Sequence, residues 1–124
     1  MAYFEEEPRI QPPLLAFLVE VRQRLVVIGS YARGERWPKD LDFLWDIDSG
    51  KARKEIEAAI RKYNLRFESM CPGNWTFVSY GWQVEILPIH RGPKFKNVIQ
   101  SATIQTINAI NGVDFRVARP EYAK

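Results

Sequence analysis

The sequence predicts an α+β fold in which one mixed β-sheet of about five strands is flanked by helices. Three observations predict it. The short runs over residues 25–28 and 82–87 are rich in β-branched and other apolar side chains, which is typical of strands. Residues 51–63 place apolar side chains at helical spacing among Lys, Arg and Glu, as in an amphipathic helix on a core. Extended and helical patterns interleave along the chain, which favours one mixed sheet.

Each element follows from turn signals and apolar spacing. Pro13 suits the first turn of a helix over residues 13–24, and Ser30 and Gly34 would bound a short helix through Arg33. The expected strands occupy residues 25–28, 41–47, 65–70, 75–80 and 82–87, the last two joined tightly at Gly81. A final helix is expected over residues 95–110, where apolar side chains recur near helical spacing at Val98, Ile99, Ala102, Ile107 and Ile110.

Size and composition indicate one soluble domain, because the chain has 124 residues of which 46% are hydrophobic and 27% are charged. We expect residues 1–12 to form an irregular arm and residues 13–124 to form the domain. Cys71 is the only cysteine, which excludes an internal disulfide and favours a reducing, cytoplasmic setting. The apolar run over 14–19 is too short for a bilayer, so no membrane partner is expected. The net charge of +3 is too mild to indicate a nucleic-acid partner by itself.

Two acids, Asp40 and Asp42, lead an otherwise apolar strand. Alternate side chains of a strand share a face, so the two carboxylates would lie side by side, roughly 7 Å apart at the backbone, with Leu41 and Phe43 facing the core. Asp is disfavoured in strands, and adjacent carboxylates repel unless a cation neutralises them. Mg²⁺ takes oxygen ligands and is commonly bound by one or two carboxylates together with substrate phosphates. The alternative is a solvent-facing strand start whose acids pair with neighbours such as Lys39.

Gly29 and Ser30 come directly after the apolar run 25–28. Glycine permits a sharp turn and close approach of a ligand to the backbone, and free N–H groups at a helix start can hold phosphate. An ordinary strand-to-helix turn with a capping serine is the alternative. The joint arrangement is more specific than either part: an apolar strand, Gly-Ser, a short spacer, then Asp40 and Asp42. It predicts a site for a metal-bound nucleoside triphosphate.

A third acid, Glu85, lies in the run over residues 82–87. Trp82, Val84 and Ile86 share one face of that strand, and Glu85 lies on the other. If this strand neighbours the one that carries Asp40 and Asp42, three carboxylates converge and could bridge two Mg²⁺ ions about 3.5–4 Å apart. Glu85 would then act as a metal ligand or as a base near the attacking hydroxyl. The alternative is a surface glutamate on a two-faced strand.

Residues 27–34 (Val-Ile-Gly-Ser-Tyr-Ala-Arg-Gly), followed by residues 39–43 (Lys-Asp-Leu-Asp-Phe), resemble the signature of the DNA polymerase beta-type nucleotidyltransferase superfamily, and its minimal nucleotidyltransferase branch in particular. The resemblance covers roughly residues 14–90. It implies a nucleotidyltransferase-like fold and transfer of a nucleoside monophosphate from a triphosphate, ATP being the expected donor, to an acceptor hydroxyl. It implies that the Gly-Ser turn binds the triphosphate, that the two strand acids bind metal, and that Glu85 is the third acid.

Departures from the family pattern concern two positions. Lys39 stands where small members often have Ser, and Glu85 stands where the minimal branch commonly has Asp. Lys39 could contact phosphate or pair with an acid. Arg33 matches an arginine that the resemblance places near the triphosphate, and a guanidinium suits phosphate oxygens in a bidentate manner; the alternative is a surface arginine. His90 is interpreted as structural or exposed, and Trp45, Trp75 and Trp82 as core residues.

Three functions from different classes follow. The first is a metal-dependent nucleotidyltransferase whose acceptor is a protein, an RNA end or a small molecule; the resemblance implies that a helical toxin or antitoxin protein is a partner. The second is a non-catalytic nucleotide- or protein-binding module with the same fold. The third is a nucleic-acid-binding protein that uses the basic region 51–66.

Overall fold

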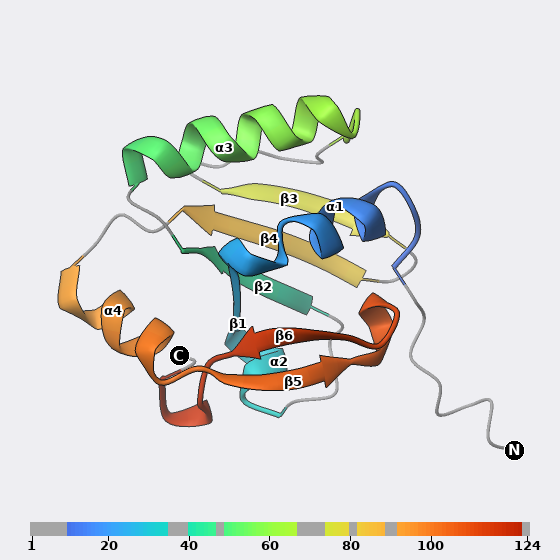
Figure 1. Cartoon of the computed structure of the whole chain (residues 1–124). Coiled ribbons are helices and arrows are strands. Elements are labelled where there is room, and N and C mark those ends of the chain that lie inside the picture. Colours follow the sequence, from blue (N-terminus) through green and yellow to red (C-terminus); the bar gives the residue numbers. More distant parts are fainter. Residues whose placement is uncertain are drawn as a thin grey trace, which may run out of the picture.

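The computed structural model describes residues 10–34, 40–46, 49–66, 74–79, 82–88 and 92–122. The helices are α1 (Leu14–Glu20), α2 (Gly29–Ala32), α3 (Ser49–Lys62) and α4 (Gly92–Gln100), and the 3₁₀ turns are η2 (Arg22–Arg24), η3 (Asn108–Ile110) and η4 (Pro120–Tyr122). The strands are β1 (Leu25–Ile28), β2 (Asp40–Trp45), β3 (Trp75–Ser79), β4 (Trp82–Pro88), β5 (Thr103–Ile107) and β6 (Val113–Val117). Figure 1 shows how these elements are arranged.

All six strands form one mixed sheet in the order β3-β4-β2-β1-β6-β5. β1 pairs antiparallel with β2 and parallel with β6, while β2 pairs parallel with β4. The outer pairs, β3 with β4 and β5 with β6, are antiparallel hairpins. The predicted α+β class is therefore confirmed, and the sheet has six strands rather than five.

One face of the sheet is apolar and carries α1 and α3. Leu41 and Phe43 of β2 are fully buried on it, as the strand alternation predicts. The Phe17 ring of α1 lies 6.1 Å from that of Phe77 on β3 and 6.2 Å from that of Tyr63, at the end of α3. These ring contacts bring both helices onto the same face, where Figure 1 shows α1 in front of the strands and α3 above them.

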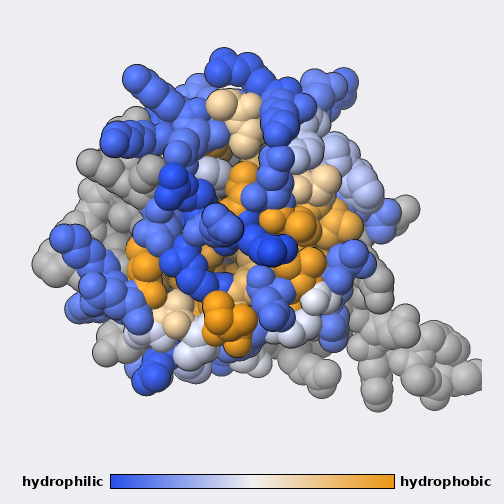
Figure 2. All heavy atoms as spheres, viewed as in Figure 1, coloured by the Kyte–Doolittle hydropathy of each residue, from blue (hydrophilic) through white to orange (hydrophobic). Residues whose placement is uncertain are grey.

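The predicted amphipathic helix corresponds to α3, which buries Ile56 and Ile60. Its outer surface is hydrophilic, and Figure 2 shows such side chains along the top of the molecule, where α3 lies. Polar contacts at the margin fix the helix: Lys62 Nζ donates to Glu20 Oε1 of α1 at 2.8 Å. The buried Trp45 donates its indole N–H to Glu55 Oε1 at 2.8 Å, so the aromatic side chain has its polar atom satisfied.

The C-terminal region differs from the expectation. A helix over residues 95–110 is wrong: α4 ends at Gln100, and residues 103–107 form β5. The apolar positions that suggested one helix belong to three elements, with Val98 on α4, Ile107 on β5 and Ile110 on η3. β-Branched Thr and Ile favour the extended conformation in this segment. The strand β6 was not expected from the sequence.

The remaining expectations concern shorter segments. Leu65 and Arg66 are not in a strand, and the rest of the strand expected over residues 65–70 lies outside the described residues, as does Gly81. Ile10, from the expected irregular arm, is buried in the core. Among the described residues, no helix combines the length and the apolarity that a membrane crossing requires.

Candidate active site

Three neighbouring strands bring the predicted site residues into one row. In the register of the sheet, Asp42 of β2 lies opposite Ile28 of β1 on one side and Glu85 of β4 on the other. Asp40 is two residues before Asp42, so its side chain projects from the same face of the sheet. The sequence predicted that Glu85 would join the other two acids, and the parallel pairing of β2 with β4 places it there.

The electrostatics of Asp42 reflect this crowding. Burial of the carboxyl, and then the negative charges of Glu85 and Asp40, raise the pKa of Asp42 from 3.8 to about 6. The positive charge of Arg33 acts in the opposite direction. A carboxyl whose ionised form is destabilised by two other carboxylates is one that a cation would stabilise.

Gly29 closes the row at the end of β1. Its φ is +73°, which an L-amino acid with a side chain rarely adopts. A Cβ on this residue would meet the carboxylate oxygen Oδ2 of Asp42 and lie 3.2 Å from Cγ. A glycine is therefore needed at this position for two reasons: the backbone has a positive φ, and a side chain would clash with the carboxylate of Asp42.

The turn after Gly29 differs in detail from the expectation. The helix α2 begins at Gly29 with Ile28 at the N-cap and no side-chain capping hydrogen bond, so the interpretation of Ser30 as the cap is wrong. The observed cap at Ile28 lies two residues before Ser30, and the positive φ of Gly29 turns the chain at that point. Ser30 lies inside α2, and its side chain is outside the described part of the chain. Gly34, with a φ of +85°, follows the end of α2 as predicted.

Asn74 is a site residue that the sequence analysis missed. Its Nδ2 donates a 2.9 Å hydrogen bond to Glu85 Oε1 across the β3–β4 pair. In the sequence, Asn74 belongs to a Pro-Gly-Asn turn signal, and this turn explains the asparagine without a role in the site. Only the pairing of β3 with β4 reveals it, because that pairing sets Asn74 beside the third acid.

The donor set fits Mg²⁺ in kind, because three carboxylates on adjacent strands share one face beside a turn that admits close approach. Within the described ranges, however, no three His, Cys, Asp or Glu side chains are arranged so that they could together hold a metal ion. The hydrogen bond from Asn74 engages one oxygen of Glu85 in this arrangement. Asp40, Asp42 and Glu85 are thus the residues that would hold the metal, and the metal site stays a prediction.

Among the other predicted site residues, the structure describes Arg33 but not Lys39 or His90. Arg33 is exposed directly after α2, and its charge reaches Asp42. The predictions for Lys39 and His90 are therefore not tested, because both lie outside the described residues. The three tryptophans interpreted as core residues, Trp45, Trp75 and Trp82, are all buried, which confirms that interpretation.

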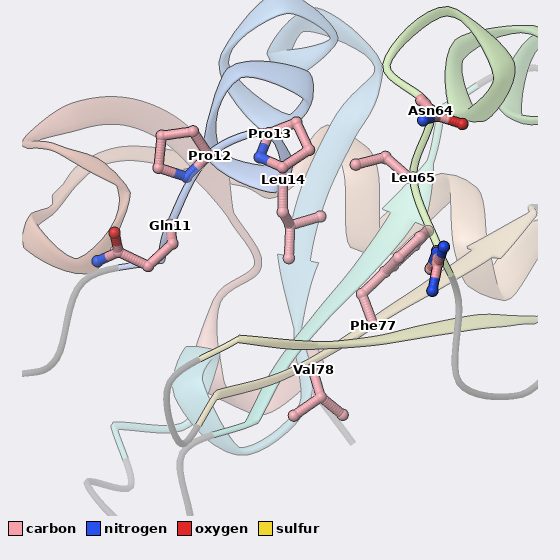
Figure 3. Close-up of a pocket in the computed structure, with 9 residues that line it drawn as sticks. Gln11, Pro12, Pro13, Leu14, Asn64, Leu65, Phe77 and Val78 are labelled. Atoms are coloured by element: carbon pink, nitrogen blue, oxygen red, sulfur yellow. The ribbon is translucent and has the colours of Figure 1, made fainter.

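Figure 3 shows a cavity, which has a volume of about 300 Å³. It is lined by residues 11–14 at the start of α1, residues 64–66 after α3, and Phe77 and Val78 of β3. None of the three acids lines it, and its lining offers no acid or nucleophile for catalysis. We assign no catalytic role to this cavity.

Comparison with known proteins adds no family assignment: no protein-family model matches the chain, and a search of curated proteins finds no match. The resemblance carried by residues 27–34 and 39–43 therefore stays a prediction from the sequence.

Proposed function

We propose that this protein is a metal-dependent nucleotidyltransferase of the cytoplasm, which moves a nucleoside monophosphate from a triphosphate to an acceptor hydroxyl and releases pyrophosphate. Asp40, Asp42 and Glu85 bind magnesium, and the turn at Gly29 and Ser30 receives the triphosphate. Arg33 and Lys39 contact the phosphates. ATP is the expected donor.

The observation that supports the proposal best is the row formed by Gly29, Asp42 and Glu85. Gly29 packs so closely on Asp42 that a Cβ would strike its carboxylate, while the register places Glu85 on the other side. A sheet that only had to be stable gains nothing from carboxyls whose burial and mutual repulsion raise the pKa of Asp42. The arrangement suits a site that receives cations together with phosphate oxygens.

The chain's own residues would act as follows. Asp40 and Asp42 would hold magnesium, which would lower the pKa of the attacking hydroxyl and offset charge on the leaving pyrophosphate. Glu85 lies beside Asp42, where it would ligate metal or accept the proton of the attacking hydroxyl. The positive charge of Arg33 lies within electrostatic reach of Asp42, as a residue that binds nearby phosphate would.

The acceptor is proposed from the resemblance: a protein hydroxyl, with a helical toxin or antitoxin protein as the partner, or an RNA end or small molecule. The basic region 51–66 does not favour nucleic acid over these. Arg53 stacks over Trp75, and Glu55 bonds Trp45, so α3 lies on the sheet face opposite to the acids. A nucleic acid held along α3 would not lie over Asp42.

The test is incubation of the protein with each labelled triphosphate, Mg²⁺ and host lysate, and measurement of pyrophosphate and of labelled macromolecules. Asp42→Asn should lower transfer by about 100-fold or more, because it removes a central metal ligand. Glu57→Gln is the matched control, since Glu57 is exposed on α3, whose packing face is away from the acids, and this variant should retain full transfer. Unchanged turnover in Asp42→Asn would overturn the proposal.

A non-catalytic nucleotide-binding module is the second candidate, and one observation favours it. Asn74 already donates a hydrogen bond to Glu85 Oε1, an oxygen that a metal or a transferred proton would need. Calorimetry of ATP binding with and without Mg²⁺, together with a pyrophosphate assay, distinguishes the transferase from the binding module. A transferase requires the metal for tight binding and releases pyrophosphate, whereas a binding module holds the nucleotide without turnover.

A further inference from the structure

The strand β5 is the outermost strand of the sheet, and it is exposed on both faces. Thr103, Ile104, Gln105 and Thr106 are all exposed, and only Ile107 is buried. Ile104 is 65% exposed although it is a large aliphatic residue. Within the described part of the chain, β5 has a neighbour, β6, on one side alone. Every second backbone N–H and C=O of an edge strand points outward without a ladder partner.

The opposite edge of the sheet is different. In β3, Trp75 and Phe77 are buried, and Val78 is the large hydrophobic side chain that is exposed, at 58%. β3 thus packs Trp75 and Phe77 into the core, whereas β5 buries only Ile107 among its five residues. The two edges allow a matched comparison within one molecule.

Natural edge strands are usually protected by charged residues, proline or bulges. β5 has none of these: the chain carries no charge and no proline from residue 97 to residue 113, although 27% of all residues are charged. Each residue of β5 pairs with β6 in unbroken register, from Thr103 with Val117 to Ile107 with Val113. The outer strand is therefore free of bulges, neutral and rich in β-branched side chains, which favours addition of another strand.

We propose that β5 pairs with β5 of a second copy of this chain, antiparallel about a two-fold axis at Gln105. The strand has five residues, so centring on Gln105 gives the greatest overlap. Ile104 would then lie opposite Thr106 of the other copy, Thr103 opposite Ile107, and Gln105 opposite itself. No pair places like charges together, so the strand is complementary to itself.

A second copy fits this edge better than an unrelated strand does, because the strand itself supplies the matching surface. The interface is isologous and closes, giving a dimer whose two sheets are continuous. The candidate active site would be unaffected, because β1 and β6 separate β2 and β4 from β5 in the strand order. None of the three acids lies on β5 or on β6, the strand next to it.

Sedimentation equilibrium over a wide range of protein concentration tests the proposal. The unmodified protein should have the mass of a dimer, and Gln105→Lys should raise the dissociation constant by about tenfold or more, because two lysines would face each other. Gln105→Glu should do the same. A mixture of the two variants should restore the dimer as a heterodimer, because only at a two-fold axis does a residue face its own copy.

The matched control is Val78→Lys on β3, which should dimerise as the unmodified protein does. Circular dichroism of each variant verifies that the fold is kept, as expected for an exposed position. A monomer at all concentrations would overturn the proposal, as would a dimer that Gln105→Lys leaves unchanged or one that Val78→Lys disrupts. Because Gln105 lies outside the candidate active site, loss of the dimer with retained metal and ATP binding separates this proposal from the proposed function.

Discussion

The two faces of the central sheet follow different rules, although the same strands make both. On β2, Leu41 and Phe43 face α1 and α3 and are fully buried, while Asp40 and Asp42 face the other way and stay partly exposed. On the helix-covered face, the side chains of β2 are apolar and buried, as close packing of a core requires. The acid-bearing face also buries Leu44, but at Asp40 and Asp42 it departs from what stability favours, because it gathers like charges. A departure of this kind points to a ligand.

Substitutions on the helix-covered face should change the free energy of unfolding more than substitutions on the acid-bearing face do. Ile56 is fully buried on α3, and Ile56→Ala should lower the free energy of unfolding by about 2–5 kcal/mol through lost burial and a cavity. Urea denaturation measures the change. Mg²⁺ binding by the folded fraction should be unaltered, because α3 lies on the face away from the acids. If metal affinity fell together with stability, the separation of the two faces would be wrong.

Gly29→Ala tests the closest contact on the acid-bearing face. The substitution should lower the free energy of unfolding by about 1–3 kcal/mol, since it forces an L side chain into positive φ and against Asp42. Thermal or urea denaturation measures it.

Gly34→Ala is the control for backbone strain, because its φ is +85° while a Cβ there would meet nothing within 4 Å. It should destabilise the protein less than Gly29→Ala does and leave ATP binding unchanged. Equal effects of the two substitutions would mean that the contact with Asp42 contributes nothing.

Asn74→Ala tests whether the hydrogen bond to Glu85 orients that acid. We expect the affinity for Mg²⁺ to fall by about tenfold, as is typical when a residue that positions a ligating carboxylate is removed. Calorimetry measures the affinity, and Asn97→Ala, an exposed asparagine on α4, serves as the control. An increased affinity would show that Asn74 competes with the metal for Glu85, and an unchanged affinity would show that it does not position that acid for the metal.

The smallest expected effect is the pH dependence of the metal-free protein. The pKa of Asp42 is raised from 3.8 to about 6 in the folded state, so between these values the folded state binds the proton more tightly than the unfolded state does. The free energy of unfolding should therefore fall as the pH rises through that window. Because the carboxyl is partly exposed, we expect a contribution of about 1 kcal/mol or less.

Asp42→Asn removes this titration. The variant should be slightly more stable than the unmodified protein at neutral pH without metal, and the two should converge as the pH falls toward 4. Urea denaturation at a series of pH values measures both proteins. Identical pH profiles would contradict the raised pKa.

Much of the fold and of the candidate site could be predicted from local patterns. The alternation in residues 40–43 predicted which side chains of β2 face the core, and helical spacing predicted the inward face of α3. The Gly-Ser turn and the Asp40 and Asp42 pair could be found because all their residues lie within one short stretch of chain. The tertiary structure moved the N-cap of α2 from Ser30 to Ile28, two residues earlier, and replaced the expected final helix by α4 and β5.

What the sequence alone determined is which segments are extended or helical over most of the chain, and that two acids follow a glycine turn. Only the tertiary structure decided that Glu85 lies beside Asp42, that Asn74 reaches Glu85, and that residues 103–107 form an exposed edge strand. The physical reason is that pairing between strands far apart in the chain sets these positions. Periodicity within a segment records which side chains are buried, but it does not record which strand lies next to it.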